Sequence, residues 1–127
     1  MIDVKDLRIG NLLLHKGKIV DVTEITNYGR ICVTDEKIVT EVKNCEPIPL
    51  TEDWLLKAGF EKLEKVNRYF KYIVACEPKN LDYRQFAVDF RKGKFIFNIR
   101  NGFEIKYLHQ LQNLYRDLTG NDLIFEL

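Results

Sequence analysis

Cationic and aromatic residues are interleaved along residues 62–100, and together they have the chemistry of a nucleic-acid surface. Ten Lys or Arg residues stand against four Asp or Glu residues in this stretch, a local charge of +6 within a chain of net charge +1. Cations contact phosphates, and each tyrosine that stacks on an unpaired base contributes about 1–3 kcal/mol. The predicted contacts are Lys62, Lys65, Arg68, Lys71, Tyr72, Arg84, Arg91, Lys92, Lys94 and Arg100.

The aromatic residues of this stretch divide according to the two-residue period of a strand. Phe86 and Phe90 share one face of their segment, and Phe95 and Phe97 share one face of the next, which predicts that all four are core residues. An ordinary sheet with buried aromatics and solvated lysines explains the same pattern. The tyrosines that remain as candidates for stacking on bases are Tyr69, Tyr72 and Tyr83.

The segment Arg91-Lys92-Gly93-Lys94 has the composition of a hairpin turn with a cationic tip. One interpretation is a projecting turn that contacts phosphates. The other is a solvent-exposed turn whose charges only contribute to solubility. It is not a phosphate-binding loop of the Walker type, because the spaced glycines and the following Ser or Thr are absent.

A second candidate surface lies on the predicted C-terminal helix. Its apolar residues recur at spacings of three and four, which a core stripe explains. The polar positions are rich in amides, and side chains three or four residues apart share one helix face. The predicted partner contacts on that face are Lys106, His109, Gln110 and Asn113.

The sequence offers little for catalysis or metal binding. The three cysteines, Cys32, Cys45 and Cys76, have no paired short spacing, which predicts buried thiols in a reducing compartment and no metal or other cofactor. His15 and His109 could form an acid–base pair, but nothing in the sequence places them together. We therefore expect no enzyme. A small hydrolase is the alternative, and it needs a pocket where one of these histidines meets a carboxylate.

The sequence predicts two groups of strands, and residues 8–46 form the first of them. Short runs rich in β-branched residues alternate with turns, as in a small meander or barrel of SH3-like size. Pro47 and Pro49 end strand pairing, so residues 1–50 form a predicted β lobe. Thr51 then has the character of a helix N-cap, and Gly59 follows the short linking helix.

Residues 51–127 predict an α+β lobe. After the short helix come antiparallel strands, and residues 104–119 show the clearest helical periodicity. Residues 123–125 have the composition of a last short strand. The predicted fold class is therefore α+β: a small β unit, a short linking helix, and an antiparallel sheet covered by a C-terminal helix, together one compact domain.

The chain of 127 residues shows neither an apolar run of membrane-spanning length nor the order of a signal peptide, so we expect a cytoplasmic protein without membrane contact.

Three segments together resemble a widespread family of small proteins encoded by phages, prophages and genomes of Bacteroidota. They are Asp6–Asn11, Glu46–Lys62 and Ile105–Gly120, of which the Leu-His-Gln-Leu-Gln-Asn-Leu-Tyr string of residues 108–115 is the most specific. The resemblance covers roughly a third of the chain and implies a mobile-element origin and a shared scaffold. It implies no catalytic residues.

The expected function is that of a non-catalytic phage or prophage accessory protein that acts by stoichiometric binding. Inhibitors of host defence, such as anti-CRISPR proteins, belong to this class, so the expected partner is a CRISPR effector or its guide RNA, bound through a basic face. The alternative is a protein–protein interaction module without nucleic-acid contact.

Overall fold

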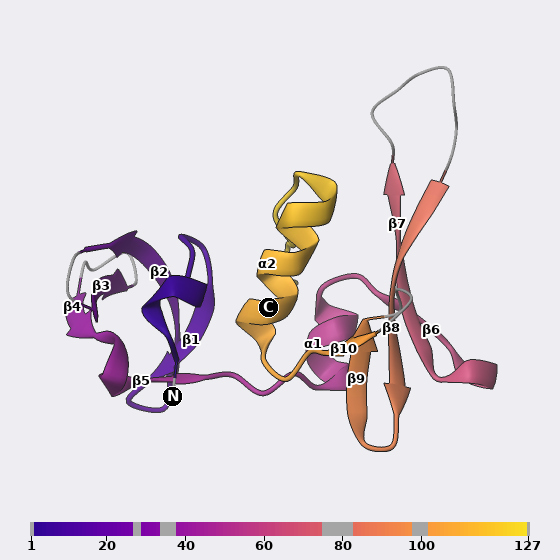
Figure 1. The fold of residues 1–127 in the computed structure, drawn as a ribbon, viewed down its shortest axis with the longest axis horizontal. Coiled ribbons are helices and arrows are strands. Elements are labelled where there is room, and N and C mark those ends of the chain that lie inside the picture. Colours follow the sequence, from indigo (N-terminus) through magenta and orange to yellow (C-terminus); the bar gives the residue numbers. More distant parts are fainter. Residues whose placement is uncertain (1, 27–28, 34–37, 75–82, 98–101, 127) are drawn as a thin grey trace. The chain divides into compact units, whose positions relative to one another are not determined.

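The computed structural model describes residues 2–26, 29–33, 38–74, 83–97 and 102–126. It has the expected α+β fold, with two five-stranded antiparallel sheets and two α-helices in the described residues (Figure 1). The chain divides into two compact units. The first comprises residues 1–49 and 107–114, and the second comprises residues 50–106 and 115–127. The first half of the C-terminal helix therefore belongs with the first unit and its second half with the second unit.

The first unit is built on a sheet with the strand order β4-β3-β2-β1-β5. Neighbouring strands follow one another in the chain until β5, which returns to pair with β1. Lys16 and Gly17 both have positive φ, as the tight turn between β1 and β2 requires. The strands are β1 (Leu12–His15), β2 (Lys18–Ile25), β3 (Arg30–Val33), β4 (Ile38–Glu41) and β5 (Cys45–Pro47).

Alternating apolar residues of these strands form the core of the first unit. Leu13, Val22, Ile31 and Val33 are fully buried. Two of the predicted buried thiols, Cys32 and Cys45, are also confirmed as buried and free, whereas Cys76 lies outside the described residues. The SH3-like likeness stays a prediction.

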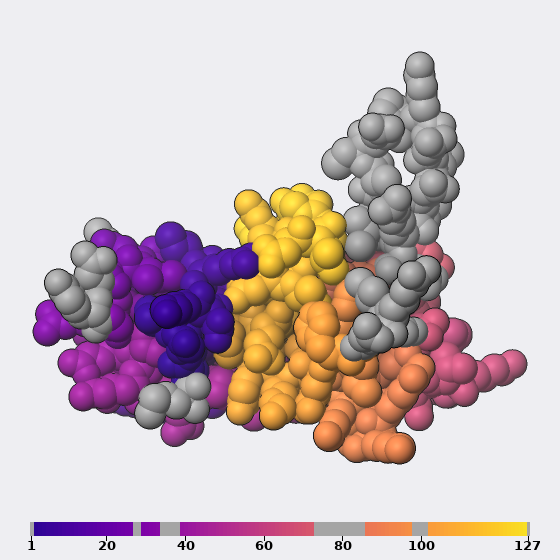
Figure 2. Space-filling model, in the orientation of Figure 1, coloured from indigo at the N-terminus to yellow at the C-terminus, as the bar shows by residue number. Residues whose placement is uncertain are grey.

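The second unit contains a sheet with the strand order β10-β9-β8-β7-β6. The predicted hairpin turn is confirmed: Lys92 and Gly93 both have positive φ and join β8 to β9 in a two-residue loop. This turn stands out at the lower edge of the view in Figure 2. The strands are β6 (Glu61–Leu63), β7 (Arg68–Val74), β8 (Tyr83–Arg91), β9 (Lys94–Phe97) and β10 (Phe103–Glu104).

The register of this sheet assigns each residue to one of two faces. Side chains alternate along a strand, and directly paired residues share a face. The inner face carries the buried residues Tyr69, Phe86, Val88 and Phe97. The opposite face, called the outer face below, carries Glu61, Leu63, Arg68, Phe70, Tyr72, Ala87, Asp89, Arg91, Lys94, Ile96 and Glu104.

Helix α1 (Glu52–Lys57) and the residues that follow it pack on the inner face. Thr51 is the predicted N-cap, and its hydroxyl accepts a hydrogen bond from the backbone N–H of Trp54. Leu55 is fully buried, and the ring of Phe60 meets that of Phe86 edge-on at 5.9 Å. Tyr115 approaches Phe86 at 5.2 Å.

Two predicted boundaries near the C-terminus are wrong. Helix α2 (Leu108–Thr119) begins four residues later than expected, because Phe103 and Glu104 pair with β9 instead. The expected last strand at residues 123–125 does not form. Phe125 packs edge-on against Trp54, with 5.6 Å between ring centroids, and the Glu126 N–H donates to the carbonyl of Lys57. Because of these contacts, residues 123–126 pack beside α1 and do not pair with the edge of a sheet.

No helix in the described part of the chain is both long enough and apolar enough to cross a membrane.

Candidate functional site

The outer face of the second sheet brings together four of the predicted nucleic-acid contacts. Arg68 and Tyr72 lie on it from β7, Arg91 from β8 and Lys94 from β9. These residues are distant in sequence, and only the antiparallel register places them on one surface. The outer face is therefore the candidate functional site.

The centre of the outer face is a buried carboxylate that holds two arginines. The side chain of Asp89 is only 2% exposed. Arg68 donates from Nε to Oδ1 at 2.7 Å and from Nη2 to Oδ2 at 3.3 Å, while Arg91 donates from Nη2 to the same Oδ2 at 3.0 Å. The hydrogen bond and the charge of Asp89 raise the pKa of Arg68. Charge-assisted bonds of this kind fix both guanidinium groups in place.

Apolar side chains flank this charged centre. Tyr72 is 53% exposed and Leu63 is 47% exposed, while Phe70 and Ile96 are half-buried. The rings of Phe70 and Tyr72 meet edge-on at 5.5 Å. Segment 61–67, which includes β6, is exposed throughout and projects from the second unit in the space-filling view (Figure 2, pink). The outer face thus combines exposed aromatic and aliphatic surface with fixed arginines.

The charges described on the outer face balance. The cations Arg68, Arg91 and Lys94 are matched by three carboxylates. Asp89 accounts for two of the cations, and Lys94 lies 3.9 Å from Glu104. Among the described residues of this face, a polyanion therefore meets no excess of positive charge, whereas the sequence of residues 62–100 as a whole carries +6.

Two further predicted contacts, Lys62 and Lys71, lie on the inner face and are engaged within the fold. Lys62 is 3.6 Å from Glu52, whose charge raises the pKa of the lysine. Lys71 donates from Nζ to the carbonyl of Ala58 at 2.8 Å, at the C-terminal end of α1, and lies over the ring of Tyr115. Burial lowers the pKa of Lys71. The described cations therefore do not gather on a single basic face.

The other predicted cations are placed as follows. Lys65 is exposed in the 3-10 helix η4 (Glu64–Val66), and Lys92 is exposed in the turn between β8 and β9. Arg84 lies in β8, but its side chain is outside the described part, as is the whole of Arg100. Whether any of the ten residues contacts nucleic acid stays a prediction.

The aromatic predictions are partly confirmed. Phe86 and Phe97 are buried as expected, but Phe90 is 38% exposed. Tyr69 is 3% exposed, so the prediction that it stacks on bases is wrong. Its ring lies on the inner face of the sheet, as does the side chain of Lys71 two positions along β7. Tyr72 has the exposure that stacking requires. The side chain of Tyr83 is outside the described residues.

The predicted partner face of the C-terminal helix is largely engaged inside the first unit. His109 is 4% exposed. Asn113 accepts from Nδ2 of Asn11 at 2.8 Å and donates to the carbonyl of Asp6. Gln110 accepts from the Tyr107 N–H. Lys106 is exposed and also has an interaction within the protein. The amide-rich composition therefore has a structural explanation, and partner contact stays a prediction.

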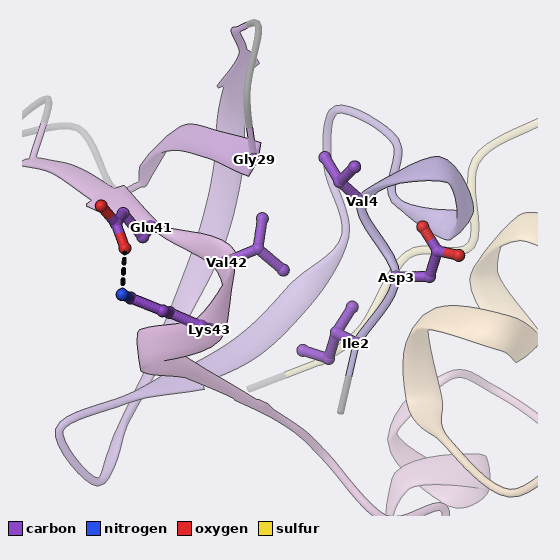
Figure 3. A pocket seen from close by; sticks show the side chains of 7 residues that line it. All are labelled: Ile2, Asp3, Val4, Gly29, Glu41, Val42 and Lys43. Carbon is purple, nitrogen blue, oxygen red and sulfur yellow. Dashed lines mark ion pairs between the residues drawn. The ribbon is translucent and has the colours of Figure 1, made fainter.

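Two open hollows are alternative sites. One of about 550 Å³ lies on the inner face beside Lys62, Tyr69 and Phe90. The other, of about 430 Å³, is in the first unit, where Val42 faces Ile2 and Val4 across the groove (Figure 3). The ion pair of Glu41 and Lys43, 2.9 Å long, lies at its edge and lowers the pKa of Glu41. Neither hollow brings together charged groups held as firmly as those around Asp89.

One further hollow bears on the small-hydrolase alternative, which needs a histidine close to a carboxylate. This hollow, of about 510 Å³ in the first unit, is lined by both His15 and Glu46. Within the described residues no hydrogen bond or ion pair joins their side chains, and the hydrolase stays an alternative prediction. Burial lowers the pKa of His109, partly offset by the charge of Asp6. In the described residues, no group of three His, Cys, Asp or Glu side chains could hold a metal ion.

Asp89 is the residue that sequence reasoning missed. A charged residue within a strand is expected to be solvated, so its sequence position gives no sign that Asp89 is buried. The available signal was local, because Arg91 stands two residues away on the same face of the same strand. The pairing with Arg68, 21 positions away, depends on the β7–β8 register.

No family model matches this chain, and no curated protein or solved structure does so either.

Proposed function

We propose that this chain is a non-catalytic protein that acts by stoichiometric binding of a partner protein through the outer face of its second sheet. The proposal rests on one observation: exposed Tyr72 and Leu63 lie on the same face as two arginines that Asp89 holds in place. Tyrosine and arginine are the residue types enriched where binding energy concentrates in protein interfaces.

The arrangement suits a protein partner for a physical reason. Long charged side chains lose rotamer entropy when a partner orders them, at roughly 0.5–1.5 kcal/mol each. Asp89 already orders Arg68 and Arg91, so part of that loss has occurred before binding. The adjacent apolar side chains Leu63, Phe70 and Tyr72 would exclude water from the contact.

The resemblance in sequence supplies the biological setting of the proposal. The chain acts in the bacterial cytoplasm as an accessory protein of a phage or prophage. Its partner is a component of a host defence system that handles nucleic acid, such as a CRISPR effector, which it inhibits by occupying a surface. What supports this setting is the likeness of residues 6–11, 46–62 and 105–120 to the family described above.

Affinity capture tests the proposal. The tagged chain is incubated with nuclease-treated lysate of a Bacteroidota host, in parallel with Tyr72→Ser, Leu63→Ser and the matched control Ile124→Ser, which removes an aliphatic side chain that is 75% exposed. The expected result is one protein captured in stoichiometric amount, with retention reduced about tenfold by each outer-face variant.

The control variant fixes the interpretation of this experiment. Ile124→Ser should retain the partner as the unaltered chain does, since residue 124 follows α2 and lies outside the outer face. Equal retention by all variants would show that the outer face is not the binding surface. A partner that is captured from untreated lysate but not from nuclease-treated lysate would show that nucleic acid bridges the two.

Direct contact with single-stranded nucleic acid is the second candidate. The observation in its favour is that Arg68, Tyr72, Arg91 and Lys94 share one face. Stacking on Tyr72 with cations at phosphates is a known binding mode for single strands. Filter binding with RNA and DNA oligonucleotides tests it: affinity should fall steeply with salt and with the charge reversals Arg91→Glu and Lys92→Glu. Absence of binding at low salt excludes it.

A further inference from the structure

The arginines of the outer face converge on a single oxygen atom. Oδ2 of Asp89 lies 3.3 Å from Nη2 of Arg68 and 3.0 Å from Nη2 of Arg91, so these two nitrogens are less than 6.3 Å apart. Two guanidinium groups at this separation repel each other unless an anion lies between them. The buried carboxylate is that anion, and it makes a pair of adjacent, ordered guanidinium groups possible.

Each arginine keeps donors that Asp89 does not use. Arg68 engages Asp89 side-on through Nε and one N–H of Nη2, which leaves Nη1 and the second N–H of Nη2. Arg91 engages it through one N–H of Nη2, which leaves Nε, Nη1 and the second N–H of Nη2. The Arg91 side chain is 63% exposed and that of Arg68 is 32% exposed. A guanidinium carries five N–H donors in a fixed plane, so these remaining groups form a donor set of defined geometry.

We infer that Arg68 and Arg91 form an anion subsite that takes a carboxylate from an acidic side chain of the partner protein, with Asp89 as the positioning residue. This inference rests on the proposed function. Two arginines and one aspartate carry a net charge of +1, which a single carboxylate neutralises. Bidentate pairing between guanidinium and carboxylate gives the contact its direction.

The charge count favours a carboxylate over a phosphate chain. Outside the Asp89 centre, the described residues of the outer face carry Lys94 against Glu61 and Glu104, so successive phosphates would meet net negative charge among them. The apolar residues next to Arg68 on β7 also favour a carboxylate of a protein segment. At about 3.3 Å per strand residue, Phe70 lies about 7 Å and Tyr72 about 13 Å from Arg68 along β7. That spacing suits the acidic side chain and apolar neighbours of one protein segment.

Nuclear magnetic resonance on the full chain tests this subsite. A blocked tetraglutamate peptide is titrated at physiological salt while the Nε–Hε signals of Arg68 and Arg91 are followed. The blocked tetraglutamine peptide serves as the uncharged comparison. We expect saturable shifts of both signals with tetraglutamate only, and an affinity about fivefold weaker in Arg91→Gln. Lys65→Gln removes one exposed cation from the same unit and should leave the affinity unchanged.

Several results would overturn the inference. These are unshifted Nε–Hε signals, an equal loss in Arg91→Gln and Lys65→Gln, or tighter binding of inorganic phosphate or single-stranded RNA than of tetraglutamate. The capture experiment separates the two proposals. If Tyr72→Ser loses the partner and Arg91→Gln keeps it, the carboxylate subsite is wrong and the proposed function stands. If both variants keep it, the proposed function is wrong.

Discussion

Asn11 and Asn113, which are 102 positions apart in the chain, share a side-chain hydrogen bond of 2.8 Å in the first unit. Asn11 is 2% exposed and also accepts from the Arg8 N–H. Next to Asn113 on α2, Gln112 accepts from the N–H of Leu12 and donates to the carbonyl of Gly10. The amides of α2 thus complete the hydrogen bonding of the segment that leads into β1, which is why this part of the helix belongs to the first unit.

Removing one partner of this pair should destabilise the protein. Asn113→Ala leaves Nδ2 of Asn11 without its acceptor in a buried position, at an expected cost of about 1–3 kcal/mol in the free energy of unfolding. Urea denaturation measures it. Leu118→Ala, at a residue of the same helix that is 52% exposed, should change stability by less than about 0.5 kcal/mol. Equal effects of the two changes would contradict a special role for the amide.

Neutralising Asp89 should weaken the fold more than neutralising a surface carboxylate. In Asp89→Asn, Arg68 and Arg91 lose their charged acceptor, and we expect a loss of about 2 kcal/mol. The matched change Glu104→Gln affects a pair 3.9 Å apart in which the lysine is 62% exposed, and it should cost less than about 0.5 kcal/mol. Thermal denaturation of both variants gives the comparison, and similar midpoints would show that the Asp89 centre is not stabilising.

Lys71 is expected to matter through the C-terminal end of α1. Lys71→Met keeps most of the apolar stem but removes the charged donor to the Ala58 carbonyl, with an expected cost of about 1 kcal/mol. The control Lys65→Met changes an exposed lysine in a short 3-10 helix and should be close to neutral. Chemical denaturation distinguishes them, and a neutral Lys71→Met would show that water replaces the ammonium group without loss.

Stability should fall on acidification because of His109. Its Nδ1 atom is buried with no hydrogen-bond partner in the described structure, and burial lowers the pKa from its ordinary value of 6.5. As the pH drops below that value, the unfolded chain takes up a proton that the folded chain does not. The contribution of this group is therefore present above about pH 6.5 and is lost toward lower pH, by at most about 1.4 kcal/mol per pH unit.

The measurement for His109 is the free energy of unfolding between about pH 5 and 7.5, the range in which a histidine of the unfolded chain takes up its proton. His109→Gln should flatten the dependence. An unchanged slope in His109→Gln would assign the pH dependence to other groups.

Local signals in the sequence determined most of the element types and most of the core. Lys92-Gly93 predicts its turn because a two-residue hairpin needs positive φ, and Thr51 predicts its cap because a hydroxyl satisfies an open N–H. Tertiary structure alone decided how charges combine. A count of cations along residues 62–100 omits which face each side chain takes and which carboxylate it meets. Those outcomes depend on strand register, in which Arg68 comes opposite Asp89 and Lys71 lies on the other face. Register is set by contacts between distant segments, so no local pattern contains it.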